Sequence, residues 1–72
     1  MSQRIIIQRW QRTRGAARLV GAWSVTGDTR KAARLFSDAL DAMQSSRHAG
    51  YVAVYRDGVR DYQPCVLNGR LV

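Results

Sequence analysis

The sequence predicts a small α+β domain, in which an antiparallel sheet of four to five strands carries one helix packed on one face. Three observations predict this fold. Two segments rich in β-branched residues precede a stretch with helical spacing, two more such segments follow it, and glycine-containing turns separate the strands of each pair. The expected order is β-β-α-β-β, within a single basic domain over residues 1–72.

The first pair of strands is expected at residues 4–11 and 16–25. The first strand contains an isoleucine run and Trp10, both favourable in strands. Between the two strands, residues 12–15 predict a turn in which Gly15 takes a positive φ. Alternation along the second strand predicts that one face carries Ala17, Leu19, Gly21, Trp23 and Val25. We therefore expect a hairpin with arginines at its tip.

A helix is expected from Thr29 to about Arg47. Asp28 is the predicted N-cap, since its carboxylate can accept from backbone N–H groups two or three residues further on. Helical spacing predicts one apolar stripe, made of Ala32, Leu35, Phe36, Ala39, Leu40 and Met43. Arg47, His48 and Gly50 are expected to end the helix, because cations and a following glycine are typical of helix C-termini.

The second pair of strands is expected at residues 51–56 and 59–67. Asp57-Gly58 between them is typical of a two-residue hairpin turn. Pro64 indicates an edge position or a bulge, because it cannot donate a backbone hydrogen bond. Asn68-Gly69 predicts another tight turn, followed by the stub of a fifth strand.

Charge carries the main indication of function. The formal net charge is +7, from twelve basic and five acidic side chains, and eleven of the basic ones are arginines. Residues 1–27 hold five arginines and no acidic residue. Uncompensated charge favours an anionic partner, and guanidinium groups bind phosphate or carboxylate in a bidentate manner. A GC-rich genome would also favour arginine over lysine, yet it would not explain the absent acidic residues.

Three groups of residues are candidates for binding nucleic acid or an acidic protein surface. The tip of the first hairpin could enter a groove or follow a backbone, through Arg9, Arg12, Arg14 and Arg18. The helix N-terminus favours an anion, through Arg30, Lys31 and Arg34. One face of the second hairpin could stack bases, through Tyr51, Tyr55, Arg60 and Tyr62. The alternatives are a solvated turn, a solvated helix face and tyrosines packed in the core.

Nothing in the sequence is typical of catalysis. Cys65 is the one cysteine, which excludes an intrachain disulfide and a structural zinc site, and we expect it to be a buried free thiol. His48 is expected to be a cation at the helix end, and Trp10 and Trp23 to lie in the core or to contact a partner. No carboxylate pair, P-loop, dinucleotide motif or nucleophile elbow is recognisable. We expect no enzyme activity, no catalytic residue, no metal, no cofactor and no small-molecule substrate.

The chain is expected to be a cytoplasmic protein without membrane contact. Ile5–Ile7 is the apolar run nearest the N-terminus, and it is too short for a signal peptide or a membrane span. A single cysteine also suits a reducing compartment.

In its order of elements the chain resembles small anti-CRISPR proteins of phages and mobile elements. The resemblance runs through TGDTRKAARLFSDALDAM and YVAVYRDGVRDY, and includes the tight Asp-Gly hairpin after the helix and the lack of catalytic groups. It implies an inhibitor that occupies a surface of a host nucleoprotein complex in the host cytoplasm, and it assigns no individual residues. Many such inhibitors are acidic and mimic DNA, whereas this chain is basic.

The sequence therefore leads to a non-catalytic binding protein. It is expected to be a phage or mobile-element inhibitor of the anti-CRISPR type that docks on a host nucleoprotein complex through an arginine-rich surface. The alternative is a module that binds DNA or RNA directly, with little dependence on sequence. A homodimer formed by pairing of exposed edge strands could accompany either function.

Overall fold

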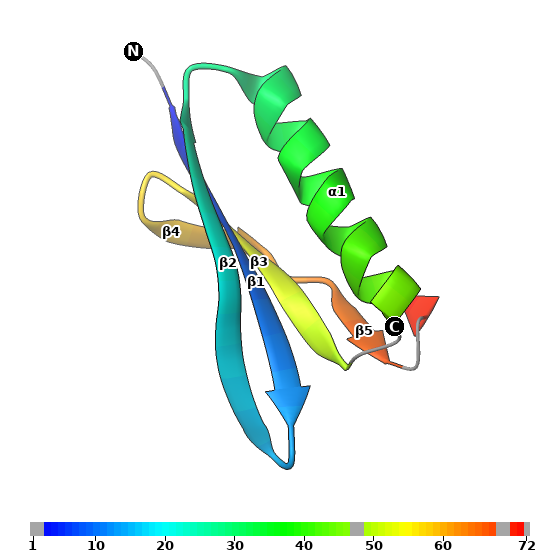
Figure 1. Ribbon diagram of the computed structural model, residues 1–72. Coiled ribbons are helices and arrows are strands. Elements are labelled where there is room, and N and C mark those ends of the chain that lie inside the picture. Colours follow the sequence, from blue (N-terminus) through cyan, green and yellow to red (C-terminus); the bar gives the residue numbers. More distant parts are fainter. Residues whose placement is uncertain (1–2, 47–48, 68–69, 72) are drawn as a thin grey trace.

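A computed structural model of the chain describes residues 3–46, 49–67 and 70–71. One helix packs against one face of an antiparallel sheet (Figure 1). The elements in chain order are β1 (Arg4–Thr13), β2 (Ala16–Thr26), α1 (Thr29–Ser46), β3 (Gly50–Arg56), β4 (Val59–Tyr62), β5 (Cys65–Leu67) and β6 (Arg70–Leu71). The predicted α+β class is confirmed, with β4 and β5 together in the place of the predicted fourth strand and β6 as the short fifth.

Strands β1 and β2 form a long hairpin that extends beyond the C-terminal end of α1 (Figure 1). Its turn consists of Arg14 and Gly15, whose φ angles are 50° and 80°. Two successive residues with positive φ are typical of the type I′ turn, which matches the twist of the strands it joins. The turn is therefore two residues shorter than predicted, because residues 12 and 13 continue β1. The hairpin contributes to an elongated molecule, with extents of 41 × 20 × 18 Å.

The core lies between α1 and the strands beneath it. The predicted apolar stripe of α1 is confirmed, since Ala32, Ala39 and Met43 are buried and the other three members are half-buried. The sheet contributes buried aliphatic side chains from four strands, namely Ile5, Ile7, Val25, Val52, Val54 and Val66. Burial of these side chains supplies the main driving force for folding.

A bulge in the first hairpin changes which residues share a face. Arg9 pairs with Gly21, whereas Trp10 pairs with Leu19, so Val20 is an extra residue in β2. Because side chains alternate along a strand, one extra residue turns the side chains beyond it to the opposite face of the sheet. The prediction that Leu19 shares a face with Gly21 and the later alternating residues is therefore wrong.

A second bulge affects the tyrosines. Val54 pairs with Tyr62 and Tyr55 pairs with Arg60, so Asp61 is the extra residue of β4. Tyr62 is thereby turned toward the helix, where its ring centroid lies 5.6 Å from that of Phe36. The prediction that Tyr62 shares a face with Tyr55 and Arg60 is wrong.

Pro64, between β4 and β5, takes the edge position that was one of its two predicted settings. The other, a bulge, is not found there, because Val54 pairs with Tyr62 and Tyr51 with Cys65 without an extra residue between them. The carbonyl oxygen of Pro64 accepts a hydrogen bond from the N–H of Val52 at 3.1 Å. Pro64 therefore keeps this segment attached to β3 although it cannot donate to the sheet. The turn that precedes β4 is also as predicted, with φ of 51° at Asp57 and 86° at Gly58.

The N-terminus of α1 is capped as predicted, whereas the glycine expected to end the helix has a different role. Asp28 Oδ1 accepts a hydrogen bond from the backbone N–H of Lys31 at 3.0 Å. Gly50, expected as a helix terminator, is instead the first residue of β3. Arg47 and His48 lie outside the described residues.

Replacing Asp28 with alanine is expected to lower the free energy of unfolding by about 1 kcal/mol, because it leaves a backbone donor of the first turn without its partner. Urea denaturation measures this change. Asp41→Ala is the control, since Asp41 is exposed within α1. Its replacement removes the same charge without affecting the cap. Equal losses in the two variants would show that the cap contributes nothing.

Candidate nucleic-acid interface

The face of the sheet opposite α1, called here the open face, is not covered by any element of the described chain. Strand alternation and pairing place on it Ile6, Gln8, Trp10, Tyr51, Tyr55 and Arg60. The rings of Trp10 and Tyr51 stack across neighbouring strands, with centroids 6.0 Å apart and planes at 20°. Tyr55 lies further along β3, and all three rings are half-buried, so each keeps exposed surface.

Hydrogen bonds hold parts of the open face in place. Trp10 Nε1 donates to Gln8 Oε1 at 3.1 Å, which fixes the indole along its own strand. Arg60 Nη1 donates to Gln63 Oε1 at 3.0 Å, which leaves the remaining guanidinium donors available. The rings and the guanidinium are therefore oriented before any ligand arrives, which lowers the entropy cost of binding.

The open face continues into the arginine-rich tip of the first hairpin. Arg12 follows Trp10 by two positions on β1 and so lies on the same face. Arg14 is in the turn, and Arg18 near the start of β2 pairs with Gln11, which places it on the face opposite Arg12; all three arginines are exposed. Within the described part of the chain, no acidic side chain forms an ion pair with them. Their charge is therefore free to act on a ligand.

Arg9 does not join these three arginines. It is half-buried on the helix side of β1, where it pairs with Gly21. Its Nε atom is buried, and no hydrogen-bond partner for it is found among the described residues. It lines a shallow groove between β2 and α1, together with Trp23 and Asp38. The four arginines predicted as one tip are therefore divided between two faces.

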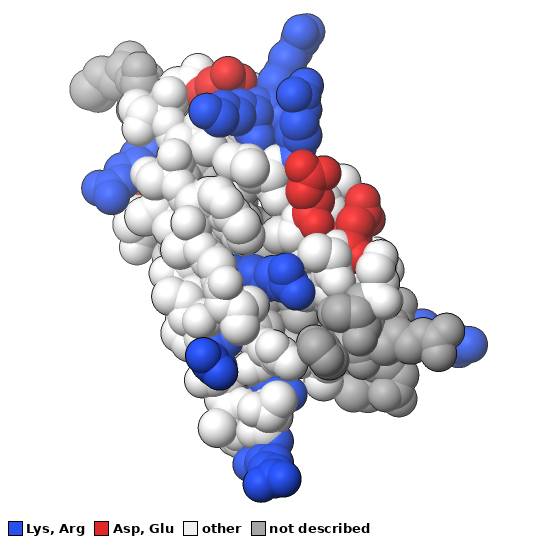
Figure 2. Space-filling view, viewed as in Figure 1, with Lys and Arg blue, Asp and Glu red and all other residues white. Residues whose placement is uncertain are grey.

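The cations at the start of α1 form a separate group. Arg30, Lys31 and Arg34 are exposed, and α1 begins at the end of the molecule away from the hairpin tip (Figure 1). Figure 2 shows basic side chains near the start of α1 and others spread from the middle of the visible face to the hairpin tip, with acidic side chains over α1. Asp28 places a carboxylate on the N-terminal N–H groups of the helix. That carboxylate occupies part of the position where we expected an external anion.

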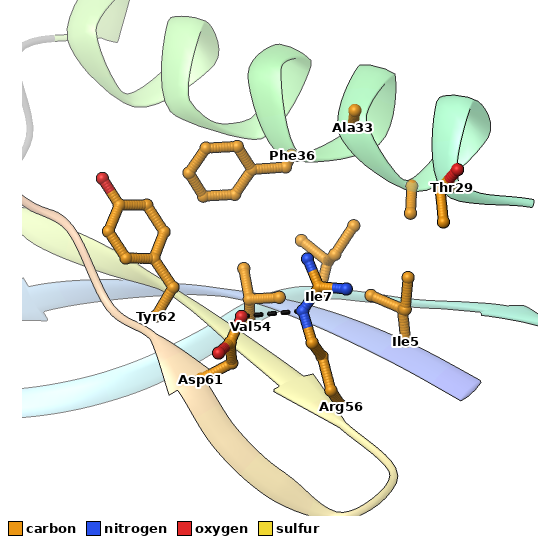
Figure 3. Close-up of a pocket in the computed structure, with 10 residues that line it drawn as sticks. Ile5, Ile7, Thr29, Ala33, Phe36, Val54, Arg56, Asp61 and Tyr62 are labelled. Atoms are coloured by element: carbon orange, nitrogen blue, oxygen red, sulfur yellow. Dashed lines mark hydrogen bonds and ion pairs between the residues drawn. The ribbon is translucent and has the colours of Figure 1, made fainter. Parts of the chain in front are cut away.

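A small hollow lies between the first half of α1 and the sheet (Figure 3). Phe36 and Tyr62 face each other on one side, and the ion pair of Arg56 with Asp61, 2.7 Å long, lies at its edge. Its volume of about 210 Å³ is below the roughly 300–1,000 Å³ typical of small-molecule sites, and most of its exposed wall is apolar. The hollow offers few polar groups for orienting a substrate.

Cys65 differs from its predicted environment. It is exposed, and it pairs with Tyr51 across β5 and β3, which places it at the border of the open face. The prediction of a buried thiol is wrong because the bulge at Asp61 shifts the alternation of all later residues, and Cys65 is turned to the open face. Its Sγ atom lies 3.9 Å from the carbonyl oxygen of Gln63.

The three candidate groups taken from the sequence left out two members of this surface. Trp10 was expected in the core or at a partner contact, and Arg4 was not singled out. The signal was present, because even-numbered positions of β1 share one face and read Arg4, Ile6, Gln8, Trp10 and Arg12. An exposed strand face that carries an aromatic residue, with arginines at both ends of the strand, indicates a ligand-binding face.

Comparison with known protein families, with curated proteins and with solved structures finds no match for this chain. Across residues 3–46, 49–67 and 70–71, no group of three or more potential metal ligands comes together. No helix in that same part of the chain is long and apolar enough to cross a membrane. The functional argument therefore depends on the geometry of the open face and the hairpin.

Proposed function

We propose that this protein binds single-stranded nucleic acid without acting on it chemically, through the open face and the tip of the first hairpin. The observation that carries the proposal is the stacked pair of Trp10 and Tyr51 on an uncovered sheet face that leads into exposed arginines. Aromatic rings bind bases of any sequence, because every base has a π face. Guanidinium groups alongside them bind the phosphates.

The spacing of the rings supports a single strand as the ligand. Tyr55 pairs with Ile6 and Tyr51 pairs with Trp10, so the two tyrosines are four residues apart on β3. Four residues of a strand span about 13 Å, which leaves room for more than one base between the rings. Bases in a duplex are already stacked on each other, whereas unpaired bases can turn toward a sheet. The open face therefore favours unpaired nucleotides.

Tyr51→Leu tests this function through fluorescence anisotropy of a labelled single-stranded oligonucleotide. We expect affinity to fall by at least about fivefold, since stacking contributes about 1–3 kcal/mol per base. Tyr62→Leu is the matched control, because Tyr62 lies on the helix side against Phe36. Equal losses in the two variants, or equal binding of single strands and duplexes, would contradict the proposal.

A second candidate function is inhibition of a host nucleoprotein complex, of the mobile-element type that the element order resembles. The observation in its favour is the separation of two basic groups along a molecule 41 Å long. Two charged ends could bridge a large surface that contains both protein and nucleic acid. The test is an affinity pull-down from a host lysate, treated with nuclease and washed at moderate salt. A single dominant complex that survives supports inhibition, and loss of all bound material favours direct nucleic-acid binding.

A further inference from the structure

The two edges of the sheet differ in how well they are protected against pairing. One edge consists of β4, β5 and β6, which have four, three and two residues. It also contains Pro64 and carries Arg60, Asp61 and Arg70. Short strands, bulges, prolines and charges are the features that prevent an edge from pairing with another chain. This edge is therefore blocked.

The other edge is the outer side of β2, and it has few of these features. It is 11 residues long and pairs only with β1 in the described sheet. It contains no proline, and Arg18 is its one charged residue. After the bulge at Val20, the segment Gly21–Thr26 is regular and uncharged. A regular, neutral strand with a free edge is suited to strand addition.

Exposed apolar side chains gather on the same strand. Leu19, Val20 and Trp23 are 44%, 43% and 36% exposed, and they are three of the five large hydrophobic residues most exposed in the described chain. Figure 2 shows the surface over β2 as largely uncharged, with basic side chains toward the hairpin tip. Trp23 lies in the regular segment on the helix side, whereas Leu19 lies beyond the bulge on the open face, so apolar surface is exposed on both sides of this edge, as at interaction sites.

We propose that the protein is a homodimer, in which residues 22–26 of β2 pair antiparallel with the same residues of a second copy, so that Ser24 lies opposite its counterpart at the two-fold axis. A two-fold axis through this segment satisfies the free backbone groups of both copies with one interface. The occupant is a second copy because the same strand can supply both sides of an antiparallel pair, and because the uncharged segment lets two chains of net charge +7 meet without like charges at the contact. Antiparallel pairing also directs the two arginine-rich tips to opposite ends, where their like charges are far apart.

The pairing has a direct effect on Trp23 and on the shape of the molecule. Trp23 lies on the helix side of β2, and its ring covers Gly21, where a Cβ atom would come within 2.7 Å of the indole. In the dimer the two Trp23 rings approach each other near the axis and lose exposure. The two sheets join into one, with both helices on one side and both open faces on the other. The proposed dimer does not depend on nucleic-acid binding. If both proposals hold, the dimer presents two open faces to the nucleic acid instead of one.

The test is analytical ultracentrifugation of the nucleic-acid-free protein over a range of concentrations. We expect twice the chain mass for the unaltered protein. Ser24→Lys is expected to raise the dimer dissociation constant at least about fivefold, because it places two like charges close to the axis. Ser37→Lys is the control, since Ser37 is exposed on α1 and the charge change is identical. Circular dichroism confirms that each variant is folded.

A charge-reversal pair makes the test sharper. Mixing Ser24→Lys chains with Ser24→Asp chains is expected to restore dimers, because opposite charges then face each other across the axis. Added salt is expected to strengthen the dimer, since each chain carries +7, whereas it weakens nucleic-acid binding. A monomer at every concentration would overturn the proposal. So would equal dimerisation of the two lysine variants, or a mixture that remains monomeric; each of these leaves the nucleic-acid test unaffected.

Discussion

Replacing Gly50 with alanine is expected to lower the free energy of unfolding by about 3 kcal/mol. Gly50 is buried at the start of β3, where a Cβ atom would collide with the backbone carbonyl oxygen of Trp10 and come within 2.6 Å of Met43 Cε. The methionine side chain can rotate away. The carbonyl cannot, because it belongs to β1, which is paired with β3 at this point. The two strands must therefore move apart to admit one methyl group.

Urea denaturation of Gly50→Ala beside Gly15→Ala measures this effect. Gly15 has open space around the position of a Cβ atom and a φ of +80°, so alanine there carries only the cost of a left-handed backbone, about 1 kcal/mol. A smaller loss at Gly50 than at Gly15 would contradict the close approach. Movement of Trp10 should also weaken its stack on Tyr51, which links this packing contact to the open face.

Gly50 also shows where sequence reasoning reaches its limit. Its position after the helix was interpreted through local chemistry, in which glycine ends a helix. The structure assigns it a different role, set by a carbonyl 40 residues away in the sequence. Elements bounded by local signals were predicted well, because caps and turns depend on neighbouring residues. Examples are the cap at Asp28 and the turn at Asp57-Gly58.

The faces of the strands were harder to predict than the strands themselves. A bulge adds one residue without changing the composition of a strand, so Val20 and Asp61 give no local signal. Each bulge moves the side chains of the residues beyond it to the opposite face of the sheet. Tyr62 moved to the helix side for this reason, whereas Tyr55 stayed on the open face as predicted.

The candidate surface was therefore predicted in part. Tyr51, Tyr55 and Arg60 share a face as expected, and the arginine-rich tip is exposed. Arg9 was grouped with the tip by its position in the sequence, although an odd-numbered residue of β1 faces the helix. Trp10 was predicted to lie in the core or to contact a partner, and its half-buried place on the open face fits the second alternative; its stack on Tyr51 was not predicted.

Replacing Arg12, Arg14 and Arg18 together with glutamine is expected to weaken binding of a single-stranded oligonucleotide about 100-fold at 0.1 M salt. Each lost phosphate contact removes about 0.7 from the slope of log affinity against log salt concentration, so three contacts reduce its magnitude by about 2. Anisotropy titrations at several salt concentrations give both quantities. Glutamine keeps much of the side-chain length and polarity, so the change is mainly one of charge.

Arg30, Lys31 and Arg34 provide the matched control, because replacing them with glutamine removes the same charge near the other end of the molecule. The Debye length at 0.1 M salt is about 10 Å, whereas the molecule is 41 Å long. A charge at the far end is therefore screened, and only guanidinium groups in contact with phosphate change the slope. A slope altered by the hairpin variant alone would locate the phosphates at the tip. Equal changes in both variants would contradict a contact surface confined to the hairpin and the open face, and would favour a ligand that spans both ends.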